Sequence, residues 1–310
     1  MSTSATTASD RFALAEQRLF AAYGLDVEQR RVALADPPLE VAVRESGAGA
    51  PVLLVHGSGM NGATWAPVLA QLPDRRVVAI DLPGFGRSDP YDYRGRGLRA
   101  HAVAQLTSVL DALDLDRVVV AGTSLGAMWA LTLALAAPGR VAGVVAMGMP
   151  AVALPGLHPD PFFRLLSTPG LGRLLARAPT PRDAAAARKA MRAVLGPAAL
   201  ERTPDELFDV VSAGMAMPGW SLAMRSHLGL AMRSGRQRPE NLVTDDELRA
   251  IAVPVRFVWG ERDVYGGPEI GRRAAALLPD AAVDVVPAGG HAPFLDAPEL
   301  CAARIRELSA

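Results

Sequence analysis

The chain has 310 residues, of which 50% are hydrophobic and 21% charged, a composition typical of a folded globular protein with a sizeable core. Its 32 basic and 32 acidic side chains balance, so no net field directs it to nucleic acid or to an anionic membrane. The only cysteine is Cys301, which excludes an intrachain disulfide framework. Residues 1–10 lack the basic and apolar regions of a secretory signal, and no apolar run reaches about 18 residues, so a cytoplasmic location is expected.

Residues 1–27 are predicted to form an N-terminal extension with one helix. The helix is expected over Arg11–Tyr23, with Asp10 as its N-cap and Gly24 at its end. Its apolar residues recur at helical spacing and predict one buried face, made by Phe12, Leu14, Ala15, Leu19 and Phe20. The extension is expected to pack on the body of the protein or over its site.

Eight strands with interleaved helices are predicted after the extension. Several of the strands are wholly apolar, which is typical of central parallel strands covered on both faces. The predicted strands are Gln29–Leu34, Leu39–Glu45, Val52–Val55, Val77–Ile80, Val118–Ala121, Val141–Met147, Val255–Trp259 and Val283–Val286. The predicted helices between and after them are Thr64–Leu72, Gly97–Leu113, Ala130–Ala136, Pro268–Leu278 and Pro298–Leu308. This alternation predicts an α/β fold with a mostly parallel sheet.

The alternation stops between residues 150 and 240. This stretch has many prolines and arginines, no convincing strand, and amphipathic helical segments at Pro161–Leu166 and Pro181–Leu195. We interpret 150–240 as an inserted helical cap. Residues 28–149 and 241–310 then form the core.

A candidate nucleophile lies between a predicted strand and a predicted helix, in the pattern Gly122-x-Ser124-x-Gly126. A sharp turn at this point would expose the Ser124 hydroxyl above the sheet, and the two glycines would allow close backbone approach. A serine hydroxyl needs a neighbouring base to become a good nucleophile.

His291 and Asp263 are the candidate base and acid, each on a loop after a predicted strand. His291 follows Gly289 and Gly290, which let its loop fold back towards the sheet. Asp263 could accept from His291 Nδ1–H and fix the tautomer of the ring. Glu261, two residues earlier, is the nearest alternative acid.

The loop His56-Gly57-Ser58-Gly59 is the candidate oxyanion site. Acyl transfer needs two convergent N–H donors for the tetrahedral oxyanion. One is expected from the backbone of Leu125, and the other from Ser58, with Gly59 as the second choice. His56 is interpreted as a residue that organises this loop.

Together these motifs resemble the α/β-hydrolase superfamily over residues 28–308. The segments that carry the resemblance are His56–Gly59, Asp81–Asp89, Gly122–Gly126, Gly260–Asp263 and Gly290–Pro298. It implies an α/β-hydrolase fold, an eight-stranded mostly parallel sheet with helices on both faces and a cap, with no cofactor and no metal. It also implies that Asp81–Ser88 is mainly a scaffold loop bordering the pocket. Ser124 excludes the relatives that use an aspartate nucleophile, the haloalkane dehalogenases and epoxide hydrolases.

Within the superfamily, His56–Trp65 and His291–Phe294 resemble carboxylesterases of the pimeloyl-ACP methyl ester esterase type. Carbon–carbon bond hydrolases share the His-Gly-Ser-Gly loop, but they typically carry tryptophan where this chain has Ala292. The expected function is hydrolysis of a small or medium, largely apolar carboxylic ester by Ser124, His291 and Asp263. The alternatives are hydrolysis of a lactone, thioester or carbon–carbon bond, perhydrolysis, or ligand binding without catalysis.

Gly59, Met149 and Trp220 are the residues expected to touch the substrate. Two interpretations of the apolar cap side chains stay open: they line an adaptable pocket, or they fill the core of the cap. These side chains are Phe162, Phe163, Met215, Met217, Trp220, Met224 and Met232. The cap arginines are a solvated face or a site for an anionic group; they are Arg164, Arg173, Arg177, Arg182, Arg188 and Arg192. The expected partner is a small-molecule substrate, not nucleic acid or membrane, and the oligomeric state is open.

Overall fold

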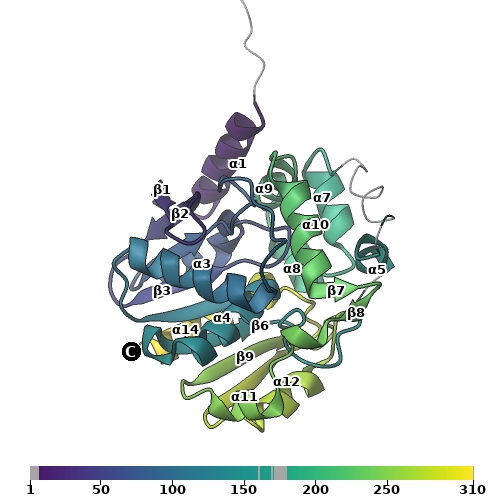
Figure 1. Ribbon diagram of the computed structural model, residues 1–310. Coiled ribbons are helices and arrows are strands. Elements are labelled where there is room, and N and C mark those ends of the chain that lie inside the picture. The colour runs from purple at the N-terminus through teal and green to yellow at the C-terminus, as the bar shows by residue number, and fades with distance from the viewer. Residues whose placement is uncertain (1–6, 160, 169, 171–179, 310) are drawn as a thin grey trace, which may run out of the picture.

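The computed structural model describes residues 7–159, 161–168, 170 and 180–309. In this part of the chain the predicted eight-stranded sheet is present, with strand order β1-β2-β4-β3-β5-β6-β9-β10 (Figure 1). Its strands are β1 Glu28–Ala33, β2 Glu40–Ser46, β3 Pro51–Val55, β4 Arg76–Ile80, β5 Val118–Thr123, β6 Val141–Met147, β9 Val255–Gly260 and β10 Ala281–Val286. The pairs β1·β2 and β2·β4 are antiparallel, and all other pairs in the sheet are parallel. The sheet is therefore mostly parallel, as predicted.

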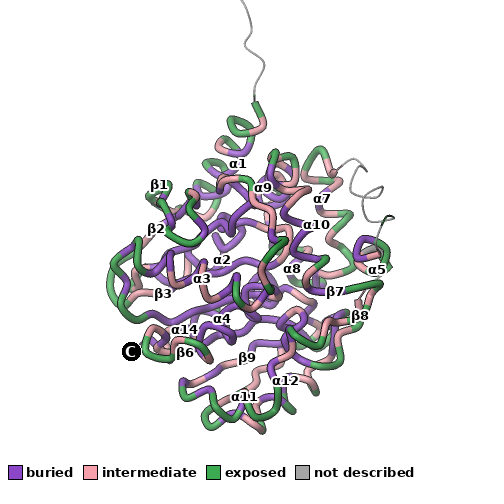
Figure 2. Tube along the Cα trace, in the orientation of Figure 1, coloured by how far each residue is buried: buried purple, intermediate pink, exposed green. Residues whose placement is uncertain are grey.

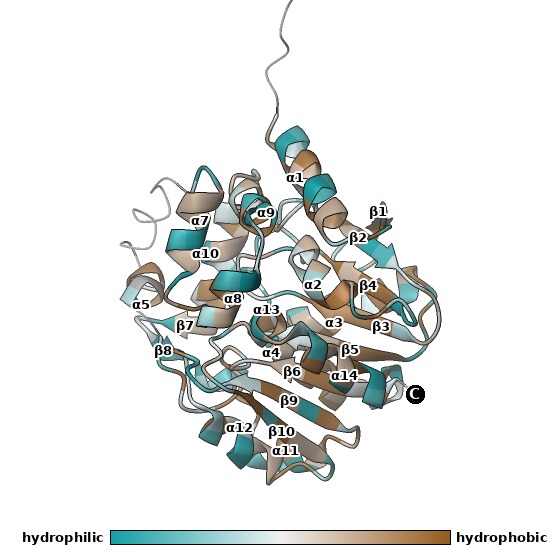
Figure 3. Cartoon of the chain, turned by 180° about the vertical axis from the view of Figure 1, so that it is seen from behind, coloured by the Kyte–Doolittle hydropathy of each residue, from teal (hydrophilic) through white to brown (hydrophobic). Residues whose placement is uncertain are grey.

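Helices cover both faces of the sheet, because its central strands are apolar on both sides. In β3, Leu53 and Val55 belong to one hydrophobic cluster, whereas Val52 and Leu54 belong to another. The first cluster includes residues of α3 Leu98–Ala112, α4 Leu125–Ala136, α11 Asp245–Ala250 and α12 Pro268–Ala275. The second includes residues of α1 Ala8–Ala22, α2 Ala66–Leu69, α13 Pro293–Asp296 and α14 Pro298–Leu308. The central strands are correspondingly buried in Figure 2 and apolar in Figure 3, whereas the edge strand β1 is mostly exposed.

The N-terminal helix begins earlier than predicted. Thr7 is its N-cap, and Asp10 lies in the first turn, so the prediction of Asp10 as N-cap is wrong. Thr7 Oγ1 accepts from Asp10 N–H at 3.1 Å, and the Asp10 carboxylate accepts from Thr7 N–H at 3.0 Å. This reciprocal capping box satisfies two N–H groups that a helix start would otherwise leave unpaired. Leu14, predicted on the packed face, is 46% exposed.

A buried ionic cluster fixes α1 to the sheet. Arg44 of β2 donates from Nε to Glu16 at 2.6 Å and from a terminal nitrogen to Asp81 at 2.9 Å. All three side chains are almost completely inaccessible to solvent, so loss of one partner would leave a buried charge uncompensated. Helix α1 also lies beside cap helix α9 Asp205–Met215 (Figure 1), and Phe12 approaches Gly214 there. The extension thus packs between body and cap.

The inserted segment over residues 150–240 is mainly helical in its described part, as predicted. Its described helices are α5 Pro161–Leu166, α7 Ala184–Met191, α8 Pro197–Arg202, α9 and α10 Trp220–Ala231. Helix α7 is shorter than the predicted Pro181–Leu195, because Asp183 caps its start by accepting from Ala186 N–H at 2.8 Å. A two-stranded hairpin, β7 Met232–Arg233 and β8 Arg236–Gln237, was not predicted. None of the helices in the described ranges is long and apolar enough to cross a membrane.

Candidate active site

Ser124 lies at the turn between β5 and α4, in a backbone conformation that side chains rarely adopt. Its φ is 52° and its ψ is −111°, which marks stored strain of the kind found at functional turns. The flanking glycines are required sterically. A Cβ added at Gly122 would lie 2.3 Å from Gly126 C, and one added at Gly126 would lie 1.9 Å from Val55 O. The pattern Gly-x-Ser-x-Gly is therefore a packing requirement of this turn.

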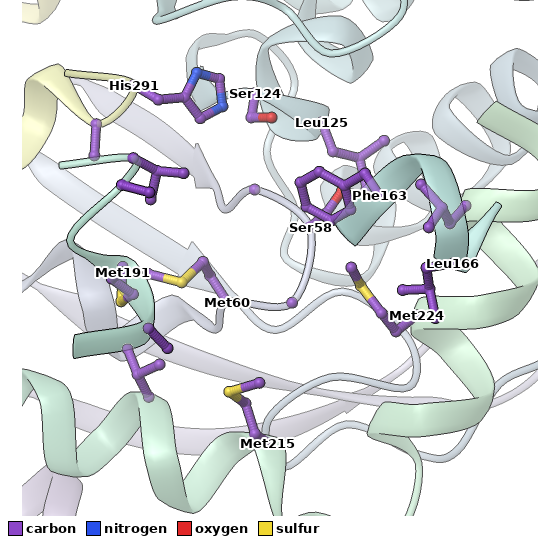
Figure 4. Close-up of a pocket in the computed structure, with 18 of the residues that line it drawn as sticks. Ser58, Met60, Ser124, Leu125, Phe163, Leu166, Met191, Met215, Met224 and His291 are labelled. Carbon is purple, nitrogen blue, oxygen red and sulfur yellow. The ribbon is translucent and has the colours of Figure 1, made fainter. Parts of the chain in front are cut away.

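His291 and Asp263 are brought together from loops after β10 and β9. His291 Nδ1 lies 3.0 Å from Asp263 Oδ1 and 2.9 Å from Oδ2. Because a carboxylate accepts, this contact assigns the proton of the neutral ring to Nδ1 and leaves Nε2 as the acceptor. Figure 4 shows the His291 ring next to Ser124, and both residues line the same cavity. The histidine loop is also tied to the cap, since His291 N–H donates to Val194 O at 2.7 Å.

Two backbone groups orient the Asp263 carboxylate. Met149 N–H donates to Oδ2 at 2.8 Å and Tyr265 N–H donates to Oδ1 at 3.0 Å. Asp263 is 6% exposed, so its oxygens are held by protein groups rather than by bulk water. The alternative acid Glu261 points elsewhere and accepts from Ala288 N–H at 2.8 Å at the surface. Only Asp263 of the two contacts His291.

The loop after β3 runs directly beside Ser124. A Cβ added at Gly57 would lie 3.2 Å from Ser124 Cβ. His56 organises this loop: its Nδ1 lies 2.7 Å from Gly57 O, and its Nε2 accepts from Leu82 N–H at 3.0 Å. Across the described part of the chain, the N–H groups of Ser58 and Leu125 have no hydrogen-bond acceptor. Both residues line the same cavity as Ser124 and His291.

Two residues of cap helix α10 hold this loop, and sequence reasoning assigned neither of them to that task. His227 Nε2 lies 2.9 Å from Ser58 Oγ, and Trp220 Nε1–H donates to Gly59 O at 2.9 Å. The first contact joins residues 169 positions apart. No local pattern around His227 could have indicated it.

The cavity in front of Ser124 has a volume of about 1340 Å³ and a mainly apolar lining. Gly59 and Trp220 line it, together with Phe163 and three of the four cap methionines named above; Met217 is not among the lining residues. Met60, Met191 and Tyr265, which sequence reasoning missed, also line it. Figure 4 shows several of the methionines around the hollow. Most of the apolar cap side chains named in the sequence analysis therefore line the pocket rather than fill the core of the cap. The side chain of Phe162 is outside the described part of the structure.

Met149 does not line the cavity, so its prediction as a substrate contact is wrong. Its side chain is completely buried in the hydrophobic core. Its contribution to the site comes from the backbone, through the N–H that holds Asp263. The position of a residue just after a strand end did not reveal which way its side chain turns.

The Asp81–Asp89 loop supports the site from behind and does not border the cavity in the described residues. Asp81 accepts from Gly62 N–H at 2.7 Å and Arg87 N–H at 2.8 Å. Phe85 packs edge-on against the rings of His56 and His227. The loop therefore acts as a scaffold, as expected, but it does not border the pocket, so that part of the expectation is wrong.

The cap arginines have different environments. Arg188 is internal to the cap: it pairs with Asp205 at 2.7 Å and lies 4.2 Å above the Phe208 ring. Arg182 lines the cavity, as does Arg225, which the sequence did not single out. Arg173 and Arg177 lie outside the described residues.

Two buried histidines predict a dependence of stability on pH. Burial lowers the pKa of both His56 and His227 from 6.5 to about 4. Between these values the unfolded chain binds protons that the folded protein excludes, so stability falls as pH decreases from about 6.5 to about 4. The loss is on the order of 3 kcal/mol for each histidine.

We expect the melting temperature to fall over that pH range, and to fall less in His227→Phe. His158→Gln, at an exposed position, controls for removal of a histidine as such. If the melting temperature of His227→Phe falls with pH as steeply as that of the wild type, the lowered pKa of buried His227 does not contribute to the pH dependence of stability, and the prediction is wrong.

The sheet, the strained serine turn and the adjoining His–Asp pair define the class as an α/β hydrolase. The sequence profile of the Alpha/beta hydrolase family matches residues 52–304, and the chain belongs to this family. It is 31% identical to a 2-hydroxy-6-oxononadienedioate/2-hydroxy-6-oxononatrienedioate hydrolase of Cupriavidus pinatubonensis, over 83% of this chain and 86% of that one. This relative is named for its action on a dioate.

Solved structures share the fold over nearly the whole chain. The carboxylesterase CesB (YbfK) of Bacillus subtilis superposes with a TM-score of 0.75 and 23% identity, covering 97% of this chain and 98% of that one. The naproxen esterase of Bacillus subtilis gives a TM-score of 0.74 at 20% identity, covering 96% of each chain. At these identities the likeness concerns the fold. The protein is a hydrolase.

Proposed function

We propose that this protein is a serine hydrolase that cleaves small or medium, largely apolar carboxylic esters through an acyl-enzyme on Ser124. The observation that carries the proposal is the His291–Asp263 pair beside Ser124 at the end of an apolar cavity. Nδ1 of His291 is engaged by Asp263, which leaves Nε2 free to take a proton.

In the proposed reaction, Ser124 Oγ attacks the ester carbonyl while His291 Nε2 accepts the hydroxyl proton. The negative charge develops on the carbonyl oxygen, and the N–H groups of Ser58 and Leu125 stabilise it. His291 then returns the proton to the leaving alcohol. A water molecule, activated by the same histidine, hydrolyses the acyl-enzyme and regenerates Ser124.

The cavity supports an apolar substrate rather than a highly charged one. Besides His227 and His291, its described lining contains three charged or basic side chains: Arg182, Asp183 and Arg225. The remaining lining is rich in methionine and aliphatic groups, which adapt to substrates of different shape. Its volume of about 1340 Å³ lies above the roughly 300–1,000 Å³ of common ligand pockets, so it is larger than a short acyl ester needs.

A series of p-nitrophenyl esters from acetate to dodecanoate tests the proposal. We expect kcat/KM to rise from acetate to a medium-chain maximum, because each buried CH₂ contributes about 0.8 kcal/mol until the pocket is filled. The matched control is the hemisuccinate ester, whose terminal carboxylate must be desolvated in the apolar pocket. No turnover of any neutral ester, or a clear preference for the anionic one, would contradict the proposal.

Carbon–carbon bond hydrolysis is a second candidate, supported by the name of the Cupriavidus pinatubonensis relative. A 2-hydroxy-6-oxo dienoate assayed beside the esters separates the two. We expect the ester activity to be much larger, since only Arg182 and Arg225 among the described lining residues could pair with a dioate. The reverse ranking would favour the second candidate.

A further inference from the structure

The loop that carries Ser58 is attached to the cap by side chains outside the proposed triad. Both attachments come from one helix, α10, and both reach the loop segment between residues 57 and 60. His227 is 1% exposed, and its polar contacts therefore persist without competition from bulk water. Trp220 and His227 are seven residues apart, two turns of helix, so they lie on the same face.

The direction of the Ser58–His227 hydrogen bond follows from the second ring nitrogen. His227 Nδ1 lies 3.1 Å from Ala223 O, and a carbonyl can only accept, so Nδ1 carries the proton. In the neutral ring Nε2 is then the acceptor, and the Ser58 hydroxyl donates to it at 2.9 Å. The backbone N–H of Ser58 stays free of protein acceptors in the described residues.

We propose that His227 and Trp220 are positioning residues through which cap helix α10 aims the Ser58 N–H at the substrate carbonyl oxygen. The inference rests on the proposed ester hydrolysis and extends it, because it makes the oxyanion site depend on the seated cap. Hydrogen-bond donors stabilise an oxyanion only when they are held in place before the charge develops. The loop from His56 to Gly59 is thus fixed at both ends: His56 is held by the core, and Ser58 and Gly59 are held by the cap.

The central variant is His227→Phe, which keeps a planar ring and removes the acceptor. We expect kcat to fall about tenfold, the scale of one well-placed hydrogen bond, with KM little changed. Binding of a trifluoromethyl ketone, which forms an oxyanion on Ser124, should weaken by the same factor as kcat/KM. Trp220→Phe removes the other bond and should act in the same direction, which keeps the test valid if one variant fails to fold.

Ser58→Ala keeps the backbone N–H and removes the hydroxyl. Ser58→Ala and His227→Phe delete the same hydrogen bond. The kcat of the double variant should therefore be no lower than that of the less active single variant. Ser226→Ala is the matched control: its hydroxyl, also on α10, accepts from Tyr93 N–H at 3.0 Å and holds a different loop. It should leave kcat, KM and inhibitor binding unchanged.

A second measurement does not depend on turnover. Amide hydrogen exchange of the 57–60 segment should accelerate in His227→Phe and not in Ser226→Ala. Wild-type kcat in His227→Phe, additive losses in the double variant, or unchanged exchange would overturn the inference. Failure of the wild-type enzyme to hydrolyse any ester would instead contradict the proposed function, and the exchange measurement would still decide whether α10 holds the loop.

Discussion

Replacing Ser124 by alanine should reduce kcat on a neutral ester by on the order of 10⁶, the scale of nucleophile loss in serine proteases. The fold should persist, because the turn depends on Gly122 and Gly126, whose missing Cβ atoms permit its close backbone contacts. Alanine also adds no atoms at position 124. The measurements are kcat and the melting temperature of the same preparation.

Labelling gives an independent check of the nucleophile. A fluorophosphonate should modify the wild-type protein at Ser124 and leave Ser124→Ala unmodified. Ser58, whose hydroxyl lies 2.9 Å from His227 Nε2, is the informative competitor. An adduct on Ser58, or on any residue other than Ser124, would assign the nucleophile elsewhere.

Asp263→Asn should reduce kcat by about 10⁴, while Glu261→Gln should have a far smaller effect. Asp263 contacts His291 Nδ1 and accepts two backbone N–H groups, so an amide NH₂ must face at least one donor. The ring of His291 would then favour the wrong tautomer. Both substitutions remove one negative charge from the same turn, which makes Glu261→Gln a matched control.

The comparison separates triad chemistry from loop stability. Glu261 accepts from Ala288 N–H and so holds the loop that carries His291. Glu261→Gln therefore tests whether activity depends only on the attachment of this loop. Melting temperatures of both variants establish that the loss of activity occurs in folded protein. A larger loss of kcat in Glu261→Gln than in Asp263→Asn would move the acid to Glu261.

Much of this architecture could be predicted from local patterns. The strands were evident because apolar runs that are buried on both faces have few alternatives. The serine turn was evident because Gly122 and Gly126 meet a steric requirement at fixed spacing. The helix start was less secure, since Thr7 and Asp10 both suit an N-cap, and only the backbone geometry distinguishes the cap from the first turn.

Tertiary structure decided the contacts between distant segments. Asp263 and Glu261 are equivalent acids in sequence, and the path of one loop brings Asp263 to His291 while Glu261 turns to Ala288. Met149 was expected in the pocket, but its side chain packs inward and only its N–H serves the site. Backbone period and steric limits act over a few residues and can be inferred from sequence. The meeting of Ser58 with His227 depends on how the whole cap is seated, and no short pattern encodes that position.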